Sequence, residues 1–181
     1  MRPHRALAAT LARELRRCGA EVDLERTVVE LTQTDERGRV TEAILDLVLT
    51  FPESVQPLYV DVTIRSPHAS RYERAHHRLG GAAAAAVREK FKRYGSSVLA
   101  IAFESYGRLA VDSHRALEHL AAHAGVSLRE WWAAPRLLPT WRAALEKSVH
   151  CSIAETDLLA LGCSVTAVAP RIAAAGCSRA G

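Results

Sequence analysis

Hydrophobic and polar positions alternate most clearly in two neighbouring stretches, residues 42–51 and 58–65, which predict adjacent β-strands. Because alternate residues of a strand share a face, each stretch has one wholly apolar face and one face with a central aspartate. Those aspartates are Asp46 and Asp61. The residues expected on the two apolar faces are Leu45, Leu47 and Leu49, and Leu58, Val60, Val62 and Ile64.

Two aspartates in the middle of apolar strands need an explanation. An ionised carboxylate in a buried strand costs several kcal/mol unless a cation or hydrogen-bond donors meet it. Either residue alone is explained equally well as a buried acid satisfied by arginine or by backbone donors. Because Asp46 and Asp61 occur together in neighbouring strands, they favour a metal site.

The remaining pattern predicts a mixed α/β fold, with a four-stranded sheet and flanking helices. The chain is expected to begin with an amphipathic helix ending at Gly19, a strand over residues 21–31, a polar turn at Gly38 and the two aspartate-bearing strands. A helix ending at Gly95 and an apolar strand over residues 98–103 follow. The C-terminal part is expected to hold a helix over residues 112–123, a capping box of Ser127 and Glu130, and a last helix from Pro139 to about Val149.

The alanine-rich segment GGAAAAAVREKFKRYG, residues 80–95, predicts a helix that covers the sheet. Spacings of three and four place Lys90 on its inward side and Lys92 on its solvent side. Two carboxylates on adjacent strands give hard oxygen ligands to Mg²⁺. A lysine aimed at them can orient a water or stabilise developing negative charge. Asp46, Asp61 and Lys90 therefore have the chemistry of a divalent-metal phosphodiester site.

Composition limits the number of domains and the kinds of partner, but it does not identify the function. A chain of 181 residues with 49% hydrophobic content suits one domain and a small helical appendage. The net charge of +4 suits an anionic partner such as nucleic acid without requiring one. The four cysteines form no CxxC pair, and no stretch is typical of a signal peptide or a membrane span. We therefore expect an intracellular protein with reduced thiols.

The element order, together with ILDLVL, LYVDVTIRSPHASRY, REKFKRYG and AFESYGRL, resembles the PD-(D/E)xK, or restriction-endonuclease-like, nuclease fold. The closer likeness, over residues 21–120, is to the endonuclease-like segment at the C-terminal end of non-LTR retrotransposon reading frames. The resemblance implies a nuclease core at residues 1–123 and a helical extension at 124–181 with a frayed end. It also implies nicking of target DNA, Mg²⁺ or Mn²⁺ on Asp46 and Asp61, a nuclear location, and a reverse transcriptase elsewhere in a larger element.

One position departs from the family pattern. The pattern expects a lysine two residues after the second acid, where this chain has Thr63. Lys90 is the expected replacement, and Lys92 is the fallback. An upstream acid completes the metal shell in some members, and we place Glu30 slightly ahead of Glu14 for that role.

The basic stretch over residues 65–78 suits phosphate contacts, and we expect Arg65, His68 and Arg71 to contact DNA together with Lys92. A solvated loop is the simpler interpretation of such a run. His119 and His123 lie one helical turn apart, but the HExxH pattern of a zinc site is absent, so a solvated helix face is the better interpretation.

Two other functions stay open. The missing lysine at Thr63 fits a catalytically inactive nucleic-acid-binding remnant of the same fold. The C-terminal third, which carries Trp131, Trp132 and Trp141, fits a helical protein-interaction module, although such tryptophans also serve as core anchors or stack on bases.

Overall fold

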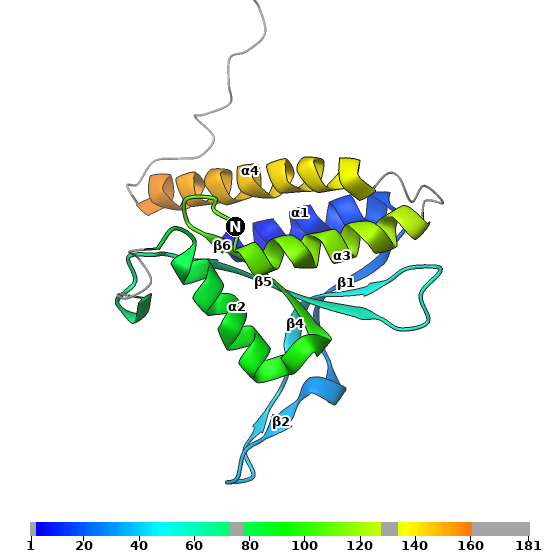
Figure 1. Cartoon of the computed structure of the whole chain (residues 1–181). Coiled ribbons are helices and arrows are strands. Elements are labelled where there is room, and N and C mark those ends of the chain that lie inside the picture. Colours follow the sequence, from blue (N-terminus) through cyan, green and yellow to red (C-terminus); the bar gives the residue numbers. More distant parts are fainter. Residues whose placement is uncertain (1–2, 73–77, 128–133, 161–181) are drawn as a thin grey trace, which may run out of the picture.

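In the computed structural model, which describes residues 3–72, 78–127 and 134–160, four strands form a mixed sheet in the order β1-β4-β5-β6 (Figure 1). β4 is antiparallel to both β1 and β5, whereas β5 and β6 are parallel. The predicted mixed four-stranded sheet with flanking helices is therefore confirmed. The strands are β1 (Glu21–Thr27), β4 (Ile44–Thr50), β5 (Leu58–Arg65) and β6 (Val98–Glu104).

Helices cover both faces of this sheet (Figure 1). Three of them, α1 (Pro3–Arg17), α3 (Val111–Ser127) and α4 (Ala134–Ala160), share the main hydrophobic core with one face. The fourth helix, α2 (Gly81–Tyr94), lies over β5 and β6 on the opposite face, where its alanines pack against Ala102. None of the helices in the described ranges is both long and apolar enough to cross a membrane.

The segment between β1 and β4 departs from the predicted pattern. The first strand ends at Thr27, and a short 3-10 helix, η1 (Val29–Leu31), follows it. The polar turn at Gly38 closes a separate two-stranded hairpin of β2 (Gln33–Thr34) and β3 (Val40–Thr41), which projects from the body (Figure 1). All four hairpin strand residues are exposed, so no apolar burial keeps this segment in the main sheet.

The C-terminal helices are longer than predicted. The boundary expected after residue 123 falls inside α3, and α4 begins before Pro139 and continues beyond Val149. Trp141, Leu145 and Val149 lie on one face of α4 and are buried in the same core as the sheet, which stabilises the longer helix. Ser127, predicted as part of a capping box, is the last residue of α3. Glu130, Trp131, Trp132 and the expected frayed end from residue 161 lie outside the described residues.

Glu104, at the end of β6, fixes the start of α2. Its carboxylate is buried and accepts hydrogen bonds from the backbone N–H groups of Gly80 (3.3 Å) and Ala82 (3.1 Å). A carboxylate at a helix N-terminus satisfies unpaired donors and interacts favourably with the helix dipole. The AFESYG segment therefore has a structural role, and it sets the position of α2 over β5.

Candidate active site

The β4 backbone is irregular at Asp46. The pairing of β1 with β4 passes from Leu24 with Leu47 to Arg26 with Leu45, so Glu25 and Asp46 are left out of the register. Glu25 has φ of +52°, a conformation that non-glycine residues adopt rarely. The pairing of β4 with β5 also stops just before Asp46. Neither neighbouring strand therefore holds the Asp46 backbone in regular pairing.

The same irregularity changes which residues share a face. Leu47 and Leu49 lie in the main core, as alternation predicts. Leu45 instead packs with Val48 in a second cluster at the C-terminal end of α2, while Ile44 is 57% exposed. The prediction that Leu45 shares a face with Leu47 is therefore wrong, because strict alternation does not continue through Asp46.

Two donors meet the Asp46 carboxylate. The backbone N–H of Val62 donates to Oδ2 at 2.6 Å, and Nε2 of His4 lies 2.7 Å from Oδ1. Burial opposes ionisation of Asp46, but the hydrogen bonds from His4 and Val62 outweigh it and hold the pKa of Asp46 below its usual value. The hydrogen bond to Asp46 in turn raises the pKa of His4. Asp46 is therefore the ionised carboxylate of the site.

Asp61 lies beside Asp46, but its pKa is shifted in the opposite direction. It is 5% exposed, and the Nζ of Lys90 lies 2.6 Å from its Oδ2. This contact is an ion pair. Burial, together with the adjacent Asp46 carboxyl, outweighs Lys90 and raises the pKa of Asp61 to about 6. The two carboxyl groups are within hydrogen-bonding range of each other, so they can share a proton.

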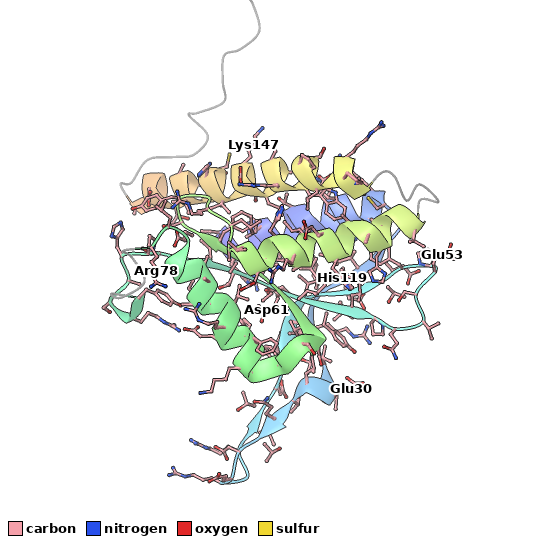
Figure 2. The ribbon with its side chains drawn as sticks, in the orientation of Figure 1. Glu30, Glu53, Asp61, Arg78, His119 and Lys147 are labelled. Carbon is pink, nitrogen blue, oxygen red and sulfur yellow. The ribbon has the colours of Figure 1, made fainter. Side chains whose placement is uncertain are left out.

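Four elements thus bring four ionisable side chains together. We call His4 of α1, Asp46 of β4, Asp61 of β5 and Lys90 of α2 the carboxylate cluster. Two adjacent carboxylates lie at its centre, with one cationic or potentially cationic group on each side. Figure 2 shows Asp61 inside the molecule, between the sheet and α2.

The other residues proposed for catalysis lie elsewhere. Thr63 is buried two residues after Asp61 and contributes no cation, and Lys92 is exposed on α2. Glu30 is exposed on η1, apart from Asp61 (Figure 2). Glu14 is buried on α1, but its carboxylate is 3.2 Å from both Arg13 and Arg17. Within the described residues, no hydrogen bond or ion pair joins Glu30 or Glu14 to the carboxylate cluster.

Sequence reasoning missed His4 and Glu25. His4 precedes Leu7 by three and Leu11 by seven residues, so it lies on the apolar stripe of the first helix. A polar residue on that stripe was a signal that could have identified His4 as a site residue. Glu25 carried no such signal. It forms an exposed ion pair with Arg5, and it lines an open pocket of about 240 Å³ together with His4 and Asp46.

The residues expected to contact DNA differ in their availability. Arg65 is half-buried at the end of β5, and its Nε has no hydrogen-bond partner. Arg71 is already paired with Glu89 at 2.6 Å. His68 and Lys92 are exposed. Residues 73–77 of the basic stretch lie outside the described part of the chain.

The donor set of the carboxylate cluster fits Mg²⁺ or Mn²⁺. Mg²⁺ binds to proteins through one or two carboxylates and keeps several waters. Asp46 and Asp61 supply two adjacent carboxylates, and Lys90 is the ion-pair partner of Oδ2 of Asp61. Over the described ranges, no three His, Cys, Asp or Glu side chains converge on one point, so these residues would hold the ion with two protein ligands.

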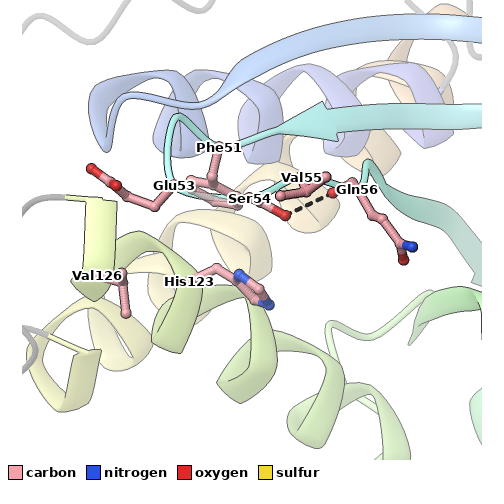
Figure 3. Close-up of a pocket in the computed structure, with 7 residues that line it drawn as sticks. All are labelled: Phe51, Glu53, Ser54, Val55, Gln56, His123 and Val126. Carbon is pink, nitrogen blue, oxygen red and sulfur yellow. Dashed lines mark hydrogen bonds between the residues drawn. The ribbon is translucent and has the colours of Figure 1, made fainter.

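His119 and His123 lie one helical turn apart on α3. The centroids of their two rings lie 4.8 Å apart, and the ring of His123 stacks on that of Phe51. This contact borders an open hollow of about 490 Å³ between α3 and the loop that follows β4 (Figure 3). Neither aspartate lines the hollow, so it is separate from the carboxylate cluster.

The chain matches no protein-family model, and no curated protein matches it. Support for a function therefore comes from the geometry of the carboxylate cluster and from the resemblance in the sequence.

Proposed function

We propose that this chain is a metal-dependent DNA endonuclease domain, in which Asp46 and Asp61 bind Mg²⁺ or Mn²⁺ and Lys90 assists phosphodiester hydrolysis. The observation that carries the proposal is the contact between two buried carboxylates on neighbouring strands, with a lysine Nζ 2.6 Å from one of them. Two carboxylates buried together repel each other, and a divalent cation removes that repulsion. The resemblance to retrotransposon endonucleases suggests DNA as the substrate and target nicking as the role.

Each residue has a distinct task in this proposal. A bound divalent ion polarises the phosphodiester and lowers the pKa of a coordinated water. Asp46 is held ionised by His4 and the Val62 amide, so it provides a fixed anionic ligand. Lys90 is partly exposed, with 22% of its side chain accessible, and it can turn from Asp61 toward a substrate phosphate. Lys90 thereby takes the part of the lysine that Thr63 replaces.

The DNA contacts proposed beside this site follow from charge. Arg65 is half-buried at the end of β5, beyond Asp61, and Lys92 is exposed on α2, two residues after Lys90. Phosphate contacts from such side chains give sequence-independent affinity that weakens with salt. Arg71 contributes less, because Glu89 already neutralises it.

Nicking of supercoiled plasmid DNA tests the proposal. With Mg²⁺ or Mn²⁺ the full chain should convert supercoiled plasmid to the open-circular form, and a chelator should stop the reaction. Asp61→Asn should lower the rate about 100-fold or more, the range seen when a group central to the chemistry is lost. Asp157→Asn, at an exposed position on α4, is the matched control for a lost negative charge. Equal nicking by the wild type and Asp61→Asn would reject the site.

The second candidate is a catalytically inactive nucleic-acid-binding remnant of the same fold. The observation that favours it is that Val62, His4 and Lys90 provide partners for both carboxylates within the chain itself. A wild-type chain that binds DNA with strong salt dependence but never nicks it, with either metal, would assign this function instead.

A further inference from the structure

His4 is the member of the carboxylate cluster that, in the proposed chemistry, neither binds the metal nor meets the substrate. Its Nε2 lies 2.7 Å from Oδ1 of Asp46, while 42% of its side chain is exposed. Burial of the imidazole therefore contributes little to the core. A cationic side chain in the first turn of a helix is also unfavourable, because it meets the positive end of the helix dipole. Since α1 begins at Pro3, the helix itself gains nothing from a protonated His4.

The contact with Asp46 does have a clear consequence. Asp46 lies where the pairing with both neighbouring strands is interrupted, so the regular sheet does not fix its orientation. Val62 holds Oδ2 and His4 holds Oδ1, and two donors on different oxygens set the plane of a carboxylate. Without His4, the carboxylate keeps only the Val62 hydrogen bond and can rotate about it.

We propose that His4 is a positioning residue, which orients the Asp46 carboxylate for metal binding without itself binding the metal. This inference rests on the proposed function, because it concerns the same site. The imidazole nitrogen that faces the cluster is engaged by Asp46, and the described residues contain no three-ligand cage. Partners of this kind, which hydrogen-bond to a ligating carboxylate, typically change metal affinity by about 10- to 100-fold.

The test measures Mn²⁺ binding to the full chain, by calorimetry and by electron paramagnetic resonance, so it does not depend on cleavage. His4→Ala removes the donor and should raise the Kd for Mn²⁺ about 10-fold or more. His4→Gln keeps an N–H donor and should stay within about 3-fold of the wild type, since the hydrogen bond is what matters. Arg13→Ala is the matched control, because Arg13 is exposed on α1 and pairs with Glu14 away from Asp46. Thermal unfolding of each variant checks that the fold is intact.

Spin-echo detection of nitrogen coupled to Mn²⁺ separates positioning from ligation. The wild type should show no imidazole nitrogen bound to the metal. An imidazole coupling that disappears in His4→Ala would overturn the proposal by making His4 a ligand. Unchanged affinity in a folded His4→Ala would overturn it as well.

Failure of the inference and failure of the proposed function give different results. If the wild type binds Mn²⁺ but never nicks DNA, the endonuclease is rejected while the affinity series still decides the role of His4. If the wild type nicks DNA and His4→Ala binds Mn²⁺ normally, only the role of His4 is rejected. If the wild type binds no metal, both are rejected.

Discussion

Replacing Asp61 with asparagine tests the buried carboxylate pair without any assay of activity. Asparagine has nearly the shape of aspartate but cannot ionise, so the substitution removes one titrating group from the cluster. In the folded chain, burial and the adjacent Asp46 raise the pKa of Asp61 from 3.8 to about 6, despite Lys90. The wild type should therefore show a dependence of stability on pH that Asp61→Asn lacks.

The sign and size of this effect follow from proton linkage. Between pH 3.8 and about 6, the folded chain holds a proton on Asp61 that the unfolded chain has released. The free energy of unfolding therefore falls as the pH rises through this interval and is constant above it. At 1.36 kcal/mol for each pKa unit, the interval corresponds to about 3 kcal/mol.

Urea unfolding in the presence of a chelator, at several pH values from about 4 to about 7.5, measures this contribution. The stability of Asp61→Asn relative to the wild type should rise by about 2–3 kcal/mol over that range. Asp157→Asn, the exposed control, accounts for the general loss of a negative charge. If the stability difference between Asp61→Asn and the wild type does not change with pH, the buried carboxyl contact is not as described.

Two further substitutions test the surroundings of the cluster. Lys90→Met removes the cation that favours ionised Asp61, so the pKa of Asp61 should rise further above about 6. The pH titration of the Asp61 carboxyl carbon in NMR spectra measures this pKa. An unchanged or lower pKa would contradict the ion pair. Glu104→Ala leaves the N–H groups of Gly80 and Ala82 without acceptors, so it should destabilise the chain by about 1–3 kcal/mol in urea. A negligible loss for Glu104→Ala would show that this carboxylate does not hold α2 in place.

Elements with strong boundary signals were predicted well. Pro57 and the Ser66-Pro67 pair bound the strand of residues 58–65, and the helix ending before Gly95 is bounded by glycines at both ends. These residues terminate an element through their own backbone restrictions, so the signal is local. The polar hairpin around Gly38 was predicted as a turn, but whether its strands join the main sheet depends on long-range pairing that periodicity does not encode.

In the candidate site, too, the residues placed by local patterns were predicted, whereas contacts that depend on long-range packing were not. Alternation and helical spacing predicted that Asp61 and Lys90 lie near each other, because both lie on regular elements. Asp46 also lies beside Asp61, although the pairing of β4 is interrupted there. The contact between His4 and Asp46 joins the first helix to an interior strand, and only the packing of α1 on the sheet brings them together. The positive φ of Glu25 accompanies the interrupted strand pairing at Asp46. It could not be predicted, because the position holds neither glycine nor asparagine, the residues that usually adopt this conformation.

The two carboxyl groups of the cluster differ in pKa, and this difference supports the proposed metal site. A carboxylate buried for structural reasons is normally compensated, and its cation or donors lower its pKa. Asp46 follows this rule, but the pKa of Asp61 stays raised although a lysine lies 2.6 Å away. Burial, and after it the adjacent Asp46 carboxyl, causes this rise. Perturbed carboxyls of this kind are concentrated at functional sites. In the proposed function, a divalent cation between Asp46 and Asp61 would relieve the repulsion of two ionised carboxylates and would leave Lys90 available for the substrate.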